Sequence, residues 1–296
     1  MHRVPTFTSK GCIMKKFNTF KSLFMVLSLT LILLLTSCTP REFIKTTYSE
    51  KIGEHINWKI IQTDNMNGSP ASINILDIDM NKFDGEIELA WYKNELLPTS
   101  EIAIQHEGIA AINGSFFDLK KTGGSVLFLQ ENGNVIQKTH DKIEFINEGA
   151  YAIDTSGVVQ IVKREGEWEY SPAYDDMIVT GPLVIYNNEL EVLDSVRFNL
   201  NRHPRTAIGI TDDYHVLLVA VDGRHEEAAG MNMWELQTFM DKLGCKDALN
   251  FDGGGSTTMY IKGKTENGIV NYPSDNGKYD HDGERKVSNA IVIIGD

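Results

Sequence analysis

Cysteine is scarce in this chain of 296 residues, where it occurs only at positions 12, 38 and 245. A secretion leader that ends before Cys38, argued below, leaves Cys245 as the single thiol besides Cys38 itself. With Cys38 carrying a lipid, neither an intrachain disulfide nor a cysteine-based metal site can form. The fold is therefore expected to be held together by its own hydrophobic core.

Nucleotide-binding motifs and internal repeats are also missing. The glycine-rich stretch at 252–256 has no lysine before Ser256, so it is not a phosphate-binding P-loop, and it does not fit the dinucleotide pattern G-x-G-x-x-G. No period of 20 to 50 residues is visible, which argues against a repeat architecture.

Acidic residues are absent from positions 1–37, which carry five basic residues and an apolar run from Leu23 to Leu35. This run is short for a membrane span and typical of a secretion leader. The small residues before Cys38 resemble a bacterial lipoprotein cleavage box, so we expect Cys38 to be lipidated. The protein is then anchored to a membrane of the cell envelope, on its periplasmic or outer side. A plain signal peptide and an N-terminal anchor helix are the alternatives.

Positive charge is in short supply once this leader is removed. The remaining chain has 23 basic and 41 acidic residues, a net charge of −18. Nucleic-acid binders depend on neutralising phosphates, so a general nucleic-acid partner is not expected. Any anionic ligand must be met by a local cluster of positive groups.

The rest of the chain divides into a polar tether at 38–54 and a single domain at 55–296. Short apolar runs separated by turn residues predict antiparallel hairpins at 125–137, 151–162 and 206–221. The run 72–80 has a slip in its alternation, which indicates a bulge or burial on both faces. Helices are predicted at 233–243, between an Asn232 cap and Gly244, and more weakly at 100–107 with a Ser100 cap. Many strands and a few packed helices predict an α+β fold.

The stretch NFDGGGSTTMY at 250–260 is the most unusual in the sequence. Consecutive glycines let main-chain amides converge on an anion, and the hydroxyls of Ser256 and Thr257 add donors. A phosphate or carboxylate ligand is favoured. A tight turn between two strands is the alternative reading.

Other polar groups stand at the ends of predicted strands. Asn113 follows one apolar run, Arg205 precedes the hairpin at 206–221 and Asp222 ends it. Arg205 offers a forked donor suited to phosphate, with a surface ion pair to Asp222 as the alternative. Glu235 lies three residues after Asn232, where a capping carboxylate is the commoner explanation.

Several motifs in this order resemble the phosphodiester glycosidase family. They are NGSFFD at 113–118, TGPLVI at 180–185, HPRTAIG at 203–209, VDGR at 221–224, the stretch 230–259, NYPSD at 271–275 and ER at 284–285. The resemblance covers roughly residues 105–296 and is most specific at 230–259.

This resemblance implies an α+β fold built on a curved, mostly antiparallel mixed sheet, and cleavage of a sugar from the phosphate of a sugar-1-phosphodiester. It implies a site formed by catalytic Asp222, Glu235, Asp252, Arg205 and Asn113, phosphate-binding Gly253, Gly254, Gly255, Ser256, Thr257 and Arg285, and sugar-binding Asn271 and Asp275. The expected substrate is a phosphorylated glycan or glycolipid of the cell surface, such as an exopolysaccharide.

The chemistry expected of such a site has three parts. Main-chain amides and Arg205 stabilise the departing phosphate, whose second pKa is about 6, so it leaves with little proton assistance. A carboxylate, Asp222 or Glu235 before Asp252, handles the water or the reacting carbon. No cofactor is required, although Asp222, Asp252 and Asp275 can offer oxygen ligands to Ca²⁺ or Mg²⁺.

Two other functions fit the same motifs. One is a surface lipoprotein that binds glycans without turning them over. The other is a phosphodiesterase that breaks the P–O bond and leaves the phosphate on the sugar.

Overall fold

Antiparallel sheets make up most of the computed structural model, which describes residues 45–119, 123–139 and 146–295. The leader at 1–37 and the lipidation site at Cys38 lie outside the described residues. Residues 43–296 form one unit. Among the described residues, no helix is both long and apolar enough to span a membrane.

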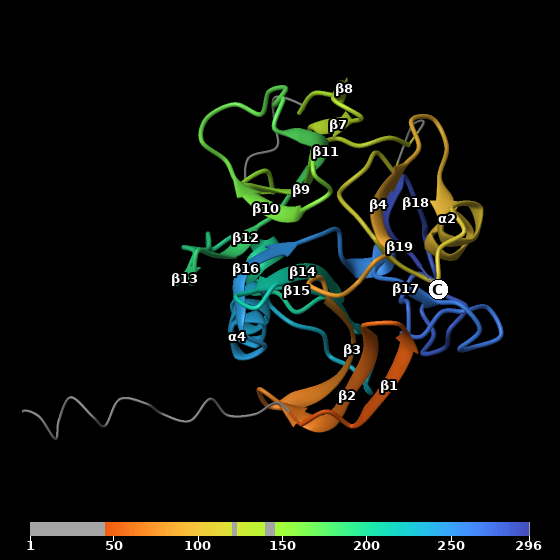
Figure 1. Ribbon diagram of the computed structural model, residues 1–296. Coiled ribbons are helices and arrows are strands. Elements are labelled where there is room, and N and C mark those ends of the chain that lie inside the picture. The colour runs from red at the N-terminus through yellow and green to blue at the C-terminus, as the bar shows by residue number, and fades with distance from the viewer. Residues whose placement is uncertain (1–44, 120–122, 140–145, 296) are drawn as a thin grey trace, which may run out of the picture. The chain divides into compact units, whose positions relative to one another are not determined.

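The largest sheet has eight strands (Figure 1). In spatial order they are β1 (Tyr48–Gly53), β2 (Ile56–Met66), β3 (Ser69–Asp79), β15 (His215–Val221), β14 (Arg205–Thr211), β16 (Cys245–Asn250), β12 (Leu183–Tyr186) and β13 (Glu189–Leu190). The neighbouring strands β3, β15, β14 and β16 are buried along almost their whole length.

Three smaller sheets complete the strands. The five-stranded sheet contains β10 (Val159–Lys163), β9 (Gly149–Asp154), β11 (Tyr174–Thr180), β7 (Leu129–Glu131) and β8 (Asn134–Gln137). The four-stranded sheet contains β17 (Met259–Ile261), β6 (Ala110–Asn113), β19 (Asn289–Ile294) and β4 (Glu86–Trp91), and β18 (Lys286–Val287) pairs with β5 (Leu97–Pro98). The expected single curved sheet is thus replaced by several, because the strands pack in layers around a shared core.

The helices are α2 (Thr99–Gln105), α3 (Arg197–Leu200) and α4 (Met233–Lys242). The prediction for α4 is confirmed, since Asn232 caps it and Gly244 follows it with a φ of 88°. The Ser100 cap is wrong. Ser100 lies inside α2, and its amide and hydroxyl both donate to the Glu284 carboxylate, which comes from a distant part of the chain.

The predicted hairpins are confirmed as β7–β8, β9–β10 and β14–β15. The slip in alternation within β3 reflects burial on both faces, because β3 pairs without a register shift at that point. The predicted tether is too long. Residues Tyr48–Gly53 form β1, a mostly polar and partly exposed edge strand that pairs with β2.

Two hydrophobic clusters lie on opposite faces of the eight-stranded sheet. One face packs against strands of the smaller sheets, with Leu218, Leu249, Ile112 and Ile291 among its buried residues. The other face packs against α4 through residues such as Leu236. Burial on both faces fixes the central strands, and with them the loops at their ends.

Candidate active site

The ends of four strands lie close together. Three of these strands belong to the eight-stranded sheet, and the fourth is β6. β14 begins at Arg205, which pairs with Val221, the last residue of β15. β16 pairs with β14 from the other side and ends at Asn250. The end of β6 joins this edge because Asn113 Nδ2 donates to the Asp252 carbonyl at 2.7 Å. The labels β14, β15 and β16 accordingly lie close together in Figure 1. The loops after β15 and β16 are therefore neighbours of the loop before β14.

The glycine-rich stretch forms a tight turn that contains the single 3-10 turn η1 (Gly254–Ser256). Several of its amides donate to groups of the protein itself, for example the Gly254 amide to the Pro204 carbonyl at 2.9 Å. Amides bonded in this way are those of Gly254, Ser256, Thr257 and Thr258. The expected nest of free amides is therefore wrong at these positions.

The hydroxyls of the turn also face inward. Ser256 is fully buried, and its hydroxyl donates to Asp252 Oδ2 at 2.7 Å. Thr257 is buried as well, with its hydroxyl 3.3 Å from that of Thr206. The structure thus turns the predicted phosphate-binding hydroxyls toward Asp252 and the interior.

Two arginine side chains lie against the glycines of the turn. A Cβ added to Gly254 would lie 2.7 Å from Nη2 of Arg224, and one added to Gly255 would collide with Nη2 of Arg285. The glycines are needed here because the guanidinium groups approach the backbone closely. The turn is therefore next to positively charged side chains, which are those of Arg224 and Arg285 and not that of Arg205.

Arg224 and Arg285 are held differently. Arg285 is paired with Asp275, and its Nη1 lies 3.4 Å from the Ser256 hydroxyl. Arg224 is exposed, and among the described residues its guanidinium makes no ion pair or hydrogen bond. Its backbone has a φ of 68°, a left-handed conformation that is strained for a side-chain-bearing residue. Arg224 is thus a cation presented to solvent at a strained position.

Asp252 is the titratable carboxyl of the turn. Desolvation raises its pKa to about 6, while the Ser256 hydroxyl and the charges of Arg285 and Arg224 act in the opposite direction. At pH 7 most molecules carry the ionised form, and a measurable fraction is protonated. A carboxyl poised in this way can exchange a proton with a ligand near neutral pH.

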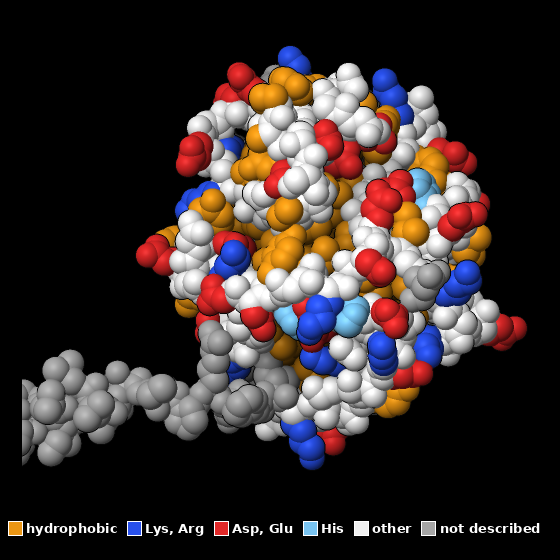
Figure 2. Space-filling view, viewed as in Figure 1, with side chains coloured by type: hydrophobic (Ala, Val, Ile, Leu, Met, Phe, Trp, Pro, Cys, Tyr) orange, Lys and Arg blue, Asp and Glu red, His pale blue; other side chains and the backbone are white. Residues whose placement is uncertain are grey.

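Histidines surround the same turn. Burial and the charges of Arg205 and Arg224 lower the pKa of His203, so its ring is neutral at pH 7. His225 follows Arg224 along the chain, and its Nε2 is buried without a partner among the described residues. Figure 2 shows histidine side chains on both sides of basic ones near the middle of this face, just below a recess lined with hydrophobic side chains.

A stack of rings braces the neighbouring loops. The Tyr272 ring stacks on the Tyr279 ring, with 3.9 Å between the ring centroids, and on the His281 ring, with 4.5 Å. The ring centroids of His225 and Tyr279 are 5.4 Å apart. This stack joins the loop after β15 to the loop that precedes β18. It therefore helps to fix Arg224 relative to Arg285, which those two loops carry.

The structure corrects the role expected of Arg205. Its side chain is fully buried, where Nε donates to the Met231 carbonyl at 2.9 Å and Nη2 donates to the carbonyls of Phe198 and Asn201. The Phe198 ring lies 4.7 Å from its Cζ atom. Nη1 is buried and has no hydrogen-bond partner within the described residues. Arg205 ties α3 to the start of β14 instead of facing a ligand.

Asp222 and Asn271 are likewise internal. Asp222 is fully buried and accepts hydrogen bonds from the Ser72 hydroxyl at 2.6 Å, the Tyr272 amide at 2.8 Å and Asn271 Nδ2 at 3.0 Å. Asn271 Oδ1 accepts from the Met259 amide. Burial raises the pKa of Asp222, and these donors oppose that rise. Asp222 and Asn271 thus anchor one loop, and their side chains are enclosed by the protein.

Glu235 is a capping residue. One of its carboxylate oxygens accepts from the Asn232 amide, and the other pairs with Arg202. Both oxygens are engaged at the start of α4, which packs on the other face of the sheet. The sequence pattern was most simply explained by a capping carboxylate, and the structure shows that cap.

Two further predicted residues are Asn113 and Asp275. Asn113 lies at the site but is buried, and its Oδ1 accepts from the Thr206 hydroxyl at 2.8 Å. Asp275 is exposed and paired with Arg285. Within the part of the chain that the structure describes, acidic, histidine and cysteine side chains form no group of three that can hold a metal ion. Asp222, Asp252 and Asp275, which can offer oxygen ligands to a cation, bond to different protein groups.

Sequence reasoning left Arg224 and His203 out of the site. Both stand inside motifs that it singled out, next to Asp222 and Arg205. The position of each residue beside a strand end is the signal that identifies them.

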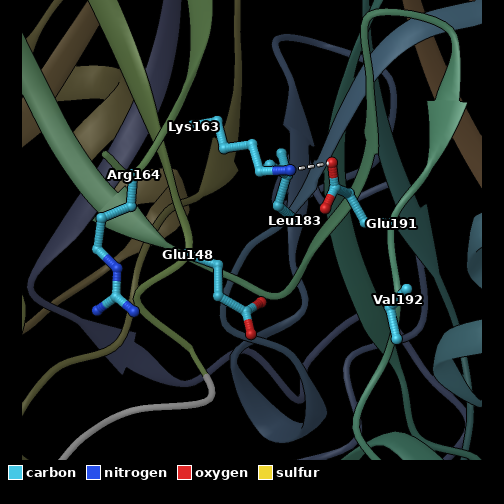
Figure 3. Close-up of a pocket in the computed structure, with 6 residues that line it drawn as sticks. All are labelled: Glu148, Lys163, Arg164, Leu183, Glu191 and Val192. Carbon is cyan, nitrogen blue, oxygen red and sulfur yellow. Dashed lines mark hydrogen bonds and ion pairs between the residues drawn. The ribbon is translucent and has the colours of Figure 1, made fainter. Parts of the chain in front are cut away.

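A separate cavity of about 200 Å³ lies between the five-stranded and eight-stranded sheets. Figure 3 shows Lys163 reaching to Glu191, with Glu148 and Arg164 on the other side. Burial raises the pKa of Glu148 to about 7. None of its lining residues belongs to the turn at Asp252, and we assign the chemistry to that turn because its charges and glycines converge there.

Comparison with known proteins gives a family match over most of the folded chain. A family profile described as phosphodiester glycosidase matches residues 106–294. The SPbeta prophage-derived protein YomE of Bacillus subtilis is 25% identical over 173 residues, which are 57% of this chain and 26% of that protein. The human N-acetylglucosamine-1-phosphodiester alpha-N-acetylglucosaminidase is 39% identical over 71 residues, 24% of this chain and 13% of that enzyme. This chain therefore spans only a minor part of these relatives.

Solved structures share the fold. The catalytic domain of the zebrafish N-acetylglucosamine-1-phosphodiester alpha-N-acetylglucosaminidase, auto-inhibited by its pro-peptide, matches with a TM-score of 0.64 at 18% identity, over 85% of this chain and 89% of that domain. A hypothetical protein from Synechocystis matches with a TM-score of 0.61 at 14% identity, over 85% of this chain and 64% of the other.

Proposed function

Because the chain belongs to the phosphodiester glycosidase family, we propose that it hydrolyses a sugar-1-phosphodiester to the free sugar and a phosphomonoester. The observation that carries this proposal is the turn at Asp252, where a carboxyl with a pKa of about 6 lies beside Arg224 and Arg285 in an acidic protein. The names of the mammalian relatives make an N-acetylglucosamine-1-phosphodiester the first substrate to test.

The phosphate is assigned to the two guanidinium groups above Gly254 and Gly255. Within the described residues Arg224 makes no hydrogen bond or ion pair, and Arg285 shares its charge with Asp275. Forked guanidinium donors suit phosphate oxygens and stabilise the negative charge that gathers on them as the sugar departs. In comparable sites the loss of one such donor lowers the rate by about 10²- to 10³-fold.

The bond changes balance with one carboxylate. A water oxygen attacks the anomeric carbon, the bond between that carbon and the phosphate oxygen breaks, and its electron pair leaves with the phosphomonoester. The proton of the water passes to ionised Asp252. Glycosidases commonly use two carboxyl groups, but a phosphate whose second pKa is about 6 departs without a strong acid. His203, neutral at pH 7, is available as a second hydrogen-bond acceptor at this edge.

The test is an assay with the methyl diester of N-acetylglucosamine 1-phosphate. Wild-type protein is expected to release free sugar, and Asp252→Asn is expected to lose at least 100-fold in kcat. Glu235→Gln is a matched control, because it alters a carboxylate that is engaged at the start of α4. Equal activity of wild-type and Asp252→Asn proteins would remove the mechanism.

Oxygen-18 water identifies the bond that breaks. Label in the released sugar supports the glycosidase. Label in the phosphate means P–O cleavage, which makes the protein a phosphodiesterase. Saturable glycan binding with no turnover means a binding lipoprotein.

The cellular setting is a second part of the proposal. We place the enzyme on the cell envelope, anchored through a lipid on Cys38, with a surface glycan or glycolipid as substrate. The basic leader and the small residues before Cys38 support it. Replacement of Cys38 by serine is expected to shift the protein from the membrane to the soluble fraction, whereas unchanged membrane association would contradict the anchor.

A further inference from the structure

A second cavity, of about 270 Å³, lies where the end of β4 meets the β7–β8 hairpin. Its lining combines one indole ring with several side chains that form hydrogen bonds. Those used below are Trp91, Lys93, Asn94 and Gln137. A large aromatic surface with a few polar groups around it is the usual composition of a small-molecule site.

Strand pairing and hydrophobic packing fix the position of Trp91. It is the last residue of β4, pairs in register with Asn289 of β19, and packs partly against the main hydrophobic cluster. The indole is only partly buried and lines the cavity with its remaining surface. A ring fixed in this way gives a flat apolar surface that costs little conformational entropy when a ligand packs on it.

The polar groups of the cavity have capacity to spare. Asn94 and Lys93 are exposed, and their side chains make no hydrogen bond or ion pair among the described residues. Gln137 donates through Nε2 to the Lys138 carbonyl at 2.6 Å, which leaves Oε1 as an acceptor. Gly124, which has a φ of 90°, lines the cavity and lies beside the Lys93 carbonyl. The cavity thus offers both donors and acceptors around the indole.

The cavity lies at the end of the four-stranded sheet where β6 reaches the candidate active site. In the four-stranded sheet, β19 lies between β4 and β6, so that Trp91 pairs with Asn289 and the next residue, Ala290, pairs with Asn113. Two strand spacings correspond to about 10 Å. Asn113 in turn bonds to the Asp252 carbonyl. Trp91 and the strand end that contacts the Asp252 turn therefore lie at the same end of this sheet.

We propose that this cavity binds a second pyranose ring of the glycan, so that the enzyme prefers a phosphodiester carrying an oligosaccharide over a minimal one. The proposal rests on the function proposed above. The apolar face of a pyranose packs against an indole, and its ring hydroxyls match the free amide of Asn94 and the acceptor of Gln137. Occupation of both subsites by one chain strengthens binding without altering either site.

A binding experiment tests the cavity independently of catalysis. Chitotriose, which has no phosphate, is titrated into wild-type protein and followed by calorimetry and tryptophan fluorescence. We expect saturable binding, with Kd raised at least fivefold by Trp91→Ala and by Asn94→Ala. Asn94 is exposed and unbonded, so its variant carries no folding risk. Trp234→Phe on α4 is the control and keeps the wild-type Kd. Absence of binding, or equal Kd values in all variants, overturns the proposal.

A kinetic experiment separates this inference from the function beneath it. The two substrates are N-acetylglucosamine-1-phosphate diesters whose second alcohol is either methanol or chitotriose. Wild-type protein is expected to favour the chitotriose ester at least tenfold in kcat/KM, and both cavity variants are expected to reduce this ratio. Hydrolysis of both esters at an equal rate leaves the proposed function standing and removes the subsite. No hydrolysis of either removes the proposed function, and the chitotriose titration then decides whether the cavity binds a sugar.

Discussion

Asp222 and Asp252 occupy similar places in the sequence and very different places in the molecule. Each follows a buried strand of the eight-stranded sheet and precedes a glycine. Asp222 is fully buried and receives donors from three residues of the protein. Asp252 is only half-buried and lies near Arg224 and Arg285. Two strand-end carboxylates in similar sequence contexts therefore differ in how far the protein's own donors enclose them.

Arg205 and Arg224 differ in the same way, one buried and one accessible. Arg205 is wholly enclosed and donates to main-chain carbonyls, whereas Arg224 is exposed and has no partner among the described residues. The buried member of each pair holds loops in place, and the accessible member presents charge at the turn. Replacing one member at a time separates stability from catalysis.

The largest contrast is expected between the arginines. Arg205→Ala removes the hydrogen bonds that the guanidinium donates to three carbonyls and opens a cavity, which should cost at least about 4 kcal/mol of unfolding free energy. Arg224→Ala should change stability by no more than about 0.5 kcal/mol and lower kcat by about 100-fold. Urea unfolding and the diester assay measure the two effects. A stable Arg205→Ala protein would break the contrast.

Asp222→Ala is expected to lose about 3 kcal/mol of unfolding free energy, because the donors of Ser72, Asn271 and Tyr272 remain buried without an acceptor. Asp222→Asn preserves one acceptor oxygen and should lose less. Denaturant midpoints of the two variants provide the check. Equal midpoints for wild-type and Asp222→Ala proteins would show that Asp222 does not anchor the loop.

Glu235→Ala removes a helix cap and a partly buried ion pair with Arg202. A loss of about 1 to 2 kcal/mol is expected in thermal or urea unfolding. Its kcat should fall far less than that of Asp252→Asn. A loss of kcat as large as that of Asp252→Asn, in a variant of near-native stability, would return Glu235 to the reacting groups.

Glu148 extends the comparison to a carboxyl with a raised pKa and no role at the turn. Burial raises its folded-state pKa from 4.5 to about 7, so the folded state holds the proton more tightly than the unfolded state. The resulting stabilisation is complete below about pH 4.5 and is lost as the pH rises to 7. Glu148→Gln should therefore be more stable than wild type by about 1 kcal/mol at pH 8, a value discounted for solvent screening, and equal to it near pH 4. Parallel unfolding curves at both pH values would reject this assignment.

The hairpins and α4 were predictable because their signals are local. Asn132-Gly133 adopts the left-handed conformations that a two-residue hairpin turn requires, and Asn232 and Glu235 form their capping box within one helical turn. The edge strand β1 was not predictable, since its mostly polar sequence lacks the alternation of apolar residues that indicates a strand.

The composition of the site was predictable only in part. The sequence marks the glycine turn and Asp252, but the fate of the turn's amides depends on the Pro204 carbonyl, which arrives from a distant segment. In the same way, only the packing of α3 decides that Arg205 faces inward. Local pattern identifies which loops meet, and tertiary contacts decide which side chains remain free.

The central claim is that Asp252 is the reacting carboxylate. It is tested most directly by the dependence of kcat/KM on pH for the methyl diester of N-acetylglucosamine 1-phosphate, in wild-type, Asp252→Asn and Asp222→Asn proteins. Wild-type activity is expected to rise with pH through a midpoint of about 6. Asp222→Asn should keep this rise, and Asp252→Asn should lose it together with most of its activity. An unchanged rise in Asp252→Asn, or its loss in Asp222→Asn alone, would contradict the claim.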